Sequence, residues 1–464
     1  MRSYIAFLIG CIALLAGCNP KLQQSRIVIP EHYAYDVRSN SDTVSLTEEW
    51  WHIFGDTTLN RLIDKALVQN RDIAIAISRI EEARAQIKVA RSEFLPTFSL
   101  GIGAGVSDSG SSSVEQSYSI ERYIGWEVPL FGSLRHTTAK AKAAASYAEW
   151  QYHGVRLSLA AEVATTYFTL LQYRRELDIA IQSSALRRES AVLIDSIYRR
   201  GMASGVNREQ AYNLVYTAEA DIPQYERAVR STLISLNLLM GEQPDTLMPE
   251  RWSLKLLDDY RPIDIPAGLP SDLMHRRPDI MEAYYQMAEA AAAVGIARSR
   301  RLPSISLTAN GGIASPDIDK LFTSKALFWK TLASLSQPVF QFGALRRQEQ
   351  TMRERYTQAM LQYEQSFDNA LSEVETALMS IETYRRETAR YRSLIESNRR
   401  ITAMTMALYR SGMSAYLDVI DAERTLYNSQ MQYSVLVAQQ YINYVNLCKA
   451  LGGGWRDGYK NTHK

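Results

Sequence analysis

The chain has 464 residues, and its 52 Lys and Arg side chains nearly balance 50 Asp and Glu side chains. This balance gives no reason to expect a polyanionic partner such as a nucleic acid. The three cysteines are Cys11, Cys18 and Cys448. If Cys11 leaves with a signal peptide and Cys18 carries lipid, no intrachain disulfide remains, and stability must come from packing.

The N-terminus has the features of a bacterial signal peptide, predicted over residues 1–17. Arg2 precedes an apolar run that ends at Leu15, shorter than the roughly 20 residues that a membrane-spanning helix needs. The motif Leu15-Ala16-Gly17-Cys18 predicts cleavage before Cys18 and acylation of that residue. No Asp follows the cysteine, which favours the outer membrane. Residues 18–55 are then a lipidated N-terminal segment; the alternative is an ordinary signal peptide with an unrelated cysteine.

The rest of the chain contains an internal duplication. Leu95-Pro96 recurs as Leu302-Pro303, an offset of 302 − 95 = 207, and Phe131-Gly132 recurs as Phe342-Gly343, an offset of 342 − 131 = 211. The anchors keep their order, which indicates a tandem repeat. We expect repeat 1 over 56–260 and repeat 2 over 261–453, followed by a tail over 454–464. Each repeat should contain a helix, two strands, a very long helix, a tight turn and another helix.

Four segments alternate apolar and polar residues with period two, as strands do. They lie at about 95–106, 118–130, 303–314 and 326–340. About ten residues suffice for a tilted strand to cross the hydrocarbon of a membrane. A soluble sheet with one wet face is the alternative. The residues that we expect to face lipid are Phe98, Leu100, Ile102, Ile124, Trp126, Ile305, Leu307 and Trp329.

Four strands cannot close a sheet, and open strand edges are not tolerated in lipid. The sequence therefore predicts an oligomer. Two copies would give about eight strands with a filled interior, and three would give about twelve with a lumen. The small and polar residues on the second face of each strand favour three copies. Beyond the signal peptide, no apolar run is long enough for a membrane-spanning helix, so a mature chain that crosses a membrane must use strands.

Two segments predict helices that are too long for a globular domain. No proline occurs over 133–221 or over 344–451. The stretches 133–198 and 343–409 would each form a helix of about 100 Å at 1.5 Å per residue. Their apolar residues follow the three-four spacing of coiled coils. Turns at 201–205 and 412–415 should reverse the chain at the end farthest from the strands. A solvated bundle without a pore is the alternative.

Several motifs make the resemblance to a known family specific. They are the Cys18 lipobox, His275-Arg276-Arg277-Pro278-Asp279, Gln337-Pro338-Val339-Phe340, and the stretch from Tyr416-Leu417-Asp418 to Asp421-Ala422-Glu423-Arg424. With these motifs the chain resembles the TolC-type outer membrane factors, in particular the lipidated branch that serves resistance-nodulation-division efflux pumps.

The resemblance implies a membrane α+β fold in which three internally duplicated protomers form a twelve-stranded β-barrel continuous with an α-helical barrel. It implies passive exit of small toxic compounds through the outer membrane. The implied partners are two further copies of the chain, a periplasmic adaptor, an inner-membrane pump of the resistance-nodulation-division type and outer membrane lipid. The implied location is the cell outer membrane with a long periplasmic extension. No cofactor is implied apart from the lipid on Cys18.

The resemblance also implies roles for individual residues. Asp418 and Asp421 match the carboxylates that ring the periplasmic constriction. Tyr409 matches a tyrosine that helps to hold neighbouring helix pairs closed. The turns at Gly201-Met202 and Gly412-Met413 match the tips that meet the adaptor. Asn207 and Ser414 depart from some relatives, which carry an acidic and a basic residue there; this puts the closing links of those relatives in doubt for this chain.

The spacing of the two aspartates supports the ring in part. Asp418 and Asp421 are three residues apart, near one face of a helix. In three copies they would surround a narrow axis with negative charge, which attracts cations and repels anions. The alternative is two solvated acids at a helix N-terminus, with Asp421 paired to Arg424.

Nothing in the sequence indicates an enzyme. The six histidines have no metal-ligand spacing, and no Walker loop, nucleophile elbow or zinc-protease motif occurs. Two other functions remain open. One is the outer membrane duct of a type I protein secretion system, which would share this architecture. The other is a periplasmic coiled-coil scaffold lipoprotein that never enters the membrane.

Overall fold

A computed structural model describes residues 22–35, 49–107, 115–243, 257 and 270–453. The predicted signal peptide, Cys18 and the tail over 454–464 lie outside the described residues. None of the described helices contains a stretch long and apolar enough to cross a membrane.

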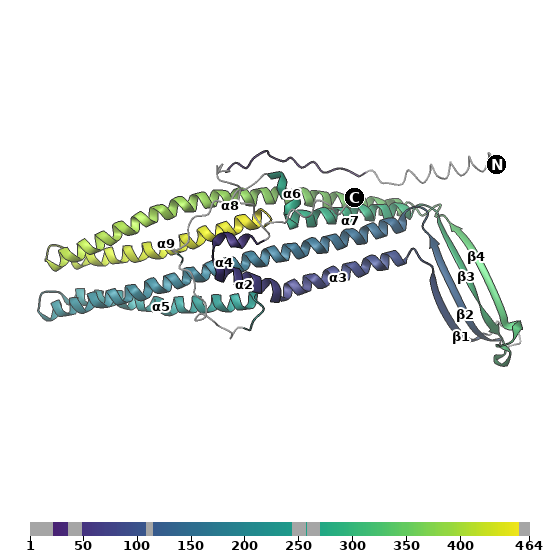
Figure 1. The fold of residues 1–464 in the computed structure, drawn as a ribbon, viewed down its shortest axis with the longest axis horizontal. Helices are drawn as coiled ribbons and strands as arrows, with labels where there is room; N and C mark the ends of the chain where they lie inside the picture. Colours follow the sequence, from purple (N-terminus) through teal and green to yellow (C-terminus); the bar gives the residue numbers. More distant parts are fainter. Residues whose placement is uncertain (1–21, 36–48, 108–114, 244–256, 258–269, 454–464) are drawn as a thin grey trace. The chain divides into compact units, whose positions relative to one another are not determined.

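The same five elements occur twice in the same order (Figure 1). The first set is α3 (Arg71–Ser92), β1 (Thr97–Ser107), β2 (Glu115–Val128), α4 (Ser133–Arg199) and α5 (Gly205–Leu239). The second set is α7 (Pro278–Ser299), β3 (Ser304–Ser315), β4 (Leu327–Ser336), α8 (Ala344–Arg410) and α9 (Tyr416–Ala450). The helices α4 and α8 have 67 residues each, as their lack of proline predicts. β4 ends four residues before the expected position 340, because Pro338 has no N–H to give to a ladder.

Short helices precede each set or connect its strands. They are η1 (Trp50–Phe54) and α2 (Thr57–Gln69) before α3, η3 (Pro270–Asp272) and α6 (Leu273–Arg276) before α7, and η4 (Ile318–Lys320) and η5 (Ser324–Ala326) between β3 and β4. The chain forms two compact units, and each unit contains segments of both repeats. Residues 77–151 and 281–366 belong to one unit, and residues 152–280 and 367–464 belong to the other.

The four strands form one antiparallel sheet in the order β1-β2-β3-β4. Phe98 lies opposite Ile124, and Trp126 lies opposite Leu307. Trp329 lies opposite Gly311 of β3. Because directly opposite residues share a face, all eight residues expected to face lipid lie on one face of the sheet. The opposite face is mostly small and polar, with Tyr123, Phe328 and Leu332 as departures.

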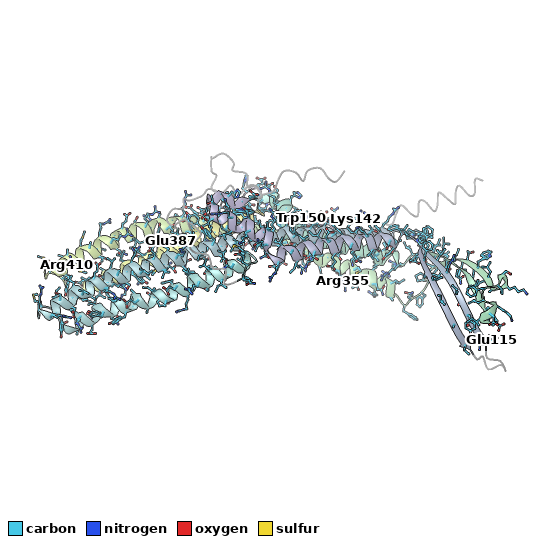
Figure 2. All side chains as sticks on the ribbon, turned by 60° about the horizontal axis from the view of Figure 1, so that its bottom comes forward. Glu115, Lys142, Trp150, Arg355, Glu387 and Arg410 are labelled. Atoms are coloured by element: carbon cyan, nitrogen blue, oxygen red, sulfur yellow. The ribbon has the colours of Figure 1, made fainter. Side chains whose placement is uncertain are left out.

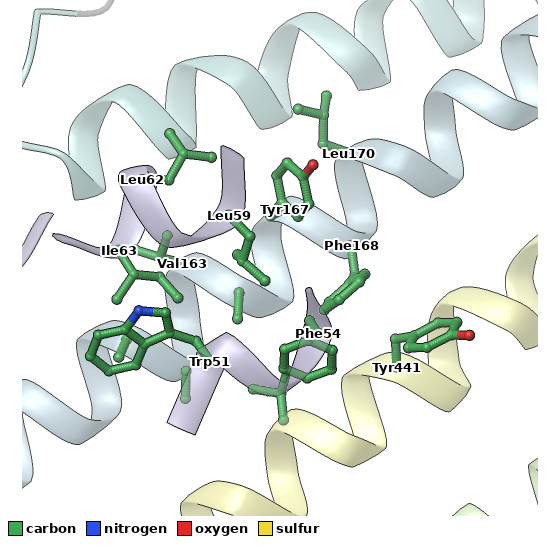
Figure 3. Close-up of a cluster of buried hydrophobic side chains, with 14 of the residues drawn as sticks. Trp51, Phe54, Leu59, Leu62, Ile63, Val163, Tyr167, Phe168, Leu170 and Tyr441 are labelled. Carbon is green, nitrogen blue, oxygen red and sulfur yellow. The ribbon is translucent and has the colours of Figure 1, made fainter. Parts of the chain in front are cut away.

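The largest core lies in the second unit and is centred on η1 and α2 (Figure 3). The ring of Phe54 lies 5.1 Å from that of Phe168 on α4, and the Phe168 ring stacks at 5.4 Å on Tyr441 of α9. Asp56 caps α2 by accepting a hydrogen bond from the Thr58 N–H at 2.7 Å. Its second carboxylate oxygen accepts the Tyr167 hydroxyl at 2.7 Å. The aromatic run from Trp50 to Phe54 therefore packs the start of the fold against α4, and Phe168 extends the same core to α9.

The Arg276-Arg277-Pro278-Asp279 motif has a structural role in the same unit. The Arg277 side chain is buried and forms ion pairs with Asp279 at 2.6 Å and with Glu373 at 2.8 Å. It also donates to the backbone carbonyl of Ala450, at the end of α9, at 2.8 Å. Burial opposes the charge of Arg277, but its two carboxylate partners outweigh that effect and raise its pKa. One guanidinium thus fixes the start of α7 against α8 and the end of α9.

Candidate gate and docking turns

The two reverse turns at the ends of the long helices have the same geometry. Gly201 has a φ of 73° and Gly412 a φ of 76°, in the left-handed region that favours glycine. In each turn the next residue donates its N–H back to the helix: Met202 to Ile197 at 3.1 Å, and Met413 to Leu408 at 2.9 Å. This pattern is a Schellman C-cap. Both methionine side chains are exposed at the tips.

Asp418 caps α9 in the single protomer. One of its carboxylate oxygens accepts the Ala415 N–H at 3.2 Å and the Ser414 hydroxyl at 3.0 Å. A carboxylate in the first turn also interacts favourably with the helix dipole. Ser414 therefore serves as a neutral hydrogen-bond partner for Asp418.

Asp421 lies one turn further along α9 and accepts a hydrogen bond from Arg424 at 3.2 Å. Both side chains of this pair are largely exposed, so the pair contributes little to stability. The ion pair between Asp421 and Arg424, which the alternative of two solvated acids predicts, is thus present within one protomer. Since Asp418 and Asp421 are both exposed, each can still face other copies of the chain.

Tyr409 connects the end of α8 to the start of α5. The Asn207 side chain of α5 interacts with its hydroxyl, and the Tyr409 ring lies 5.2 Å from that of Tyr416. Burial raises the pKa of Tyr409, although the Asn207 side chain opposes the shift. The end of α8 and the start of α5 therefore interact through Tyr409 and the neutral amide of Asn207.

A buried polar cluster behind these turns joins α4, α5 and α9. Arg187 of α4 donates to the backbone carbonyl of Leu214 at 3.1 Å, and its guanidinium lies 4.8 Å from the centre of the Tyr427 ring. The Tyr427 hydroxyl donates to Asp221 at 2.7 Å. Ser190 and Glu423 extend the cluster along α4 and α9.

The sequence analysis did not single out this cluster. Burial raises the pKa of Glu423, while Arg187 and a 3.3 Å hydrogen bond from Ser190 act in the opposite direction. Burial lowers the pKa of Arg187, and Glu423, Tyr427 and Asp221 oppose the shift. Along the chain Arg187 is one charged residue among many. Only the packing of three helices shows that it is buried.

A cavity of about 620 Å³ lies between α4, α8 and α9 beside this cluster. Leu186, Met406 and Leu426 give it an apolar lining, and Arg410 also lines it. Arg410 is the last residue of α8 (Figure 2). Within the described part of the chain, no group of three or more His, Cys, Asp and Glu side chains could hold a metal ion.

Comparison with known proteins agrees with this geometry. The sequence profile of the outer membrane efflux protein family matches residues 62–242 and 269–453, which include both sets of elements. This chain belongs to the outer membrane efflux protein family. The resemblance inferred from the sequence motifs is therefore confirmed.

Two relatives illustrate the likeness. The chain is 32% identical over 462 residues to the solvent efflux pump outer membrane protein SrpC of Pseudomonas putida, covering 96% of this chain and 97% of SrpC. It is 28% identical over 454 residues to the probable outer membrane lipoprotein SilC of Salmonella typhimurium, covering 96% of this chain and 98% of SilC.

The fold also matches a solved channel. The structure of CusC, described in terms of transmembrane channel formation, superposes with a TM-score of 0.84 at 26% identity, covering 94% of this chain and 99% of CusC. The expected fold class, a small membrane sheet joined to very long helices, is therefore confirmed. The family and SrpC are both described in terms of efflux.

Proposed function

We propose that this chain is the outer membrane exit channel of a tripartite efflux pump, assembled as a trimer. The observation that carries the proposal is the sheet. Its four strands place every expected lipid-facing residue on one face, while β1 and β4 remain unpaired at its edges. Three copies would pair these edges into a barrel of about twelve strands, which is wide enough for a lumen.

The channel would be passive and anchored by lipid on Cys18, with its helices in the periplasm. SrpC is described as part of a solvent efflux pump, and SilC is described as a probable outer membrane lipoprotein. By analogy we infer that this chain passes small toxic compounds delivered by an inner-membrane pump of the resistance-nodulation-division type and its adaptor. The exposed tips at Met202 and Met413 would meet the adaptor, with the left-handed glycines Gly201 and Gly412 shaping them.

The gate would lie at the start of α9. In a trimer Asp418 and Asp421 would contribute six exposed carboxylates around the axis, which favours cations over anions. A hydrogen bond between the Tyr409 hydroxyl and the Asn207 amide would hold the end of α8 against α5 in the closed state. Opening would then require this bond to break in each protomer.

Planar bilayers test the proposal. The purified protein should insert and give discrete single-channel currents. Ile102→Lys places a charge on the lipid face of β1, at a cost of about 2–4 kcal/mol near the bilayer midplane, and should reduce insertion strongly. Ser99→Lys, on the opposite face of the same strand, is the matched control and should still insert. Absence of any current from the parent protein would refute the channel function, and equal loss in both variants would refute the assignment of the two faces.

A further inference from the structure

Two buried polar atoms in the cavity between α4, α8 and α9 have no hydrogen-bond partner among the described residues. One is Nε of Arg187 on α4, a residue that is only 4% exposed. The other is Oε2 of Glu423 on α9. Both residues line the cavity. Because buried polar atoms in proteins are nearly always paired, an unpaired donor and an unpaired acceptor in one cavity indicate that a bound group supplies their partners.

The charge around this cavity is positive. Its charged lining residues are Arg175, Arg187, Arg399, Arg410, Glu189 and Glu423. The formal charges of four arginines and two glutamates give 4 − 2 = +2. Burial raises the pKa of Glu423, although Arg187 and Ser190 oppose the shift, and a raised pKa favours the neutral carboxyl. The excess of positive charge favours an anionic ligand.

Two of the lining arginines have no acidic partner. Arg399 and Arg410 are exposed and form no ion pair with another described residue. Arg175, in contrast, donates to Asp178 on its own helix at 3.0 Å. The guanidinium groups of Arg399 and Arg410 are therefore available to a ligand. A carboxylate or sulfonate group can accept two parallel hydrogen bonds from one guanidinium.

A smaller cavity of about 230 Å³ continues the first one. The two cavities share the lining residues Arg175, Ile179, Arg399 and Gln430. The smaller cavity adds Arg392 and Glu396, so the charge excess does not change. All residues that line the two cavities belong to the second unit. The larger cavity alone, at about 620 Å³, has the size of a pocket for a drug-sized molecule.

Apolar side chains from all three helices also line the larger cavity. They are Ile179, Leu186 and Leu193 of α4, Met406 of α8 and Leu426 of α9. Leu186 is 65% exposed, so an apolar group bound beside it would remove apolar surface from water. The lining thus combines unpaired positive charge with apolar contact area.

We propose that this cavity binds a small organic anion that has an apolar or aromatic body. The acidic group would accept hydrogen bonds from the arginines, including Nε of Arg187, and the body would cover Leu186. A cation would be repelled by the excess of guanidinium groups, and a neutral hydrocarbon would leave Nε of Arg187 unpaired. The cavity is formed by one chain, so the proposed binding does not depend on the trimer or on the gate.

Isothermal titration calorimetry with naphthalene sulfonate as the probe tests this binding. The purified protein is titrated in a non-ionic detergent, and a titration into detergent alone supplies the blank. Naphthalene sulfonate should bind saturably, with one site per chain. Lack of saturable binding by a sample of trimeric native mass would overturn the site and leave the proposed channel in place, because water or a helix of a neighbouring copy would then fill the cavity. Saturable binding by a monomeric sample would support the site and count against the trimer.

Two related probes separate the charge from the apolar contact. Naphthalene sulfonamide keeps the rings but is neutral, and methanesulfonate keeps the acidic group without the rings. Each should bind at least about tenfold more weakly than naphthalene sulfonate, because each loses one of the two interactions. Equal affinity for the sulfonamide would refute the selection of an anion, and equal affinity for methanesulfonate would refute the apolar contact.

A pair of neighbouring arginines provides a matched test of the charge. Arg399→Gln removes one guanidinium from the lining and should weaken binding of naphthalene sulfonate at least about fivefold. Arg400 is the next residue of α8, is also exposed and lines neither cavity. Arg400→Gln should therefore leave the affinity unchanged. Equal weakening by the two substitutions would mean that the probe responds to the general charge of the surface, which would contradict the proposed site.

A pair of apolar residues on α4 tests the other half of the site. Leu186→Asn should lower the affinity for naphthalene sulfonate at least about threefold, because the rings lose an apolar contact. Val192, which is 61% exposed, does not line the cavity, so Val192→Asn should have no effect. Both side chains are exposed, so neither substitution disturbs the packed core. The same affinity in both variants would overturn the placement of the apolar body.

Discussion

Removal of the Tyr409 hydroxyl should open the channel. Tyr409→Phe removes the hydroxyl that would bond to Asn207 in the proposed closed state but keeps the ring that lies 5.2 Å from Tyr416. A neutral hydrogen bond contributes about 0.5–1.5 kcal/mol net. If three protomers close one gate, the closed state loses about 1.5–4.5 kcal/mol. At about 1.4 kcal/mol per factor of ten, the ratio of open to closed channels should rise roughly 10-fold to 2000-fold.

The assay is the open probability of single channels in planar bilayers at neutral pH. The duplication supplies a matched control, because Tyr198 is the equivalent of Tyr409, since 198 + 211 = 409. The Tyr198 ring lies 5.8 Å from the Arg208 guanidinium, a contact that phenylalanine retains. Tyr198→Phe should therefore leave the open probability unchanged.

A second variant tests the partner in this bond. Asn207→Ala removes the amide and should raise the open probability by a similar factor. The double variant of Tyr409 and Asn207 should be no more open than either single variant, because both remove the same bond. Equal open probabilities for Tyr409→Phe and Tyr198→Phe would refute the reasoning, as would simple addition of the two effects in the double variant.

Three further predictions follow from the same region. Asp418→Ala combined with Asp421→Ala should reduce cation selectivity, seen as a reversal potential closer to zero in a salt gradient; an unchanged potential would count against the ring. Met413→Glu, at an exposed tip, should abolish resistance in cells while the purified protein keeps its trimeric mass; full resistance would remove the docking role. Burial raises the pKa values of Tyr416 and Tyr441 above their unfolded value of about 10. Their contribution to stability is present below pH 10 and lost as the pH rises further, so the melting temperature should fall above that pH, and a constant value to pH 12 would be inconsistent with it.

The sequence predicted those features that depend on local spacing. Alternation with period two marked all four strands, because a strand with one wet and one apolar face must alternate. Lack of proline and three-four spacing marked α4 and α8 to within one residue of their observed ends. The left-handed turns at Gly201 and Gly412 were also visible, because few other residues adopt that conformation readily. The motifs together, of which the stretch around Asp418 and Asp421 was the most specific, indicated the family.

Contacts between distant segments could not be predicted in this way. Three contacts join residues that are far apart in the chain. They are the pairing of β2 with β3, the packing of Arg187 against Tyr427, and the interaction of Asn207 with Tyr409. The sequence around a charged residue does not show whether that residue is solvated or buried, because the residues that bury it lie on other helices.

The sequence by itself thus determined that this protein has two repeats, strands with one apolar face and helices too long for a globule. Recurring motifs revealed the repeats, and the spacing of apolar residues and the lack of proline revealed the strands and helices. Only the tertiary structure decided how the repeats pair, what surrounds the gate residues, and which two strands form the edges of the described sheet. Register and burial depend on which segments meet in space, and no local pattern in this chain specifies that choice.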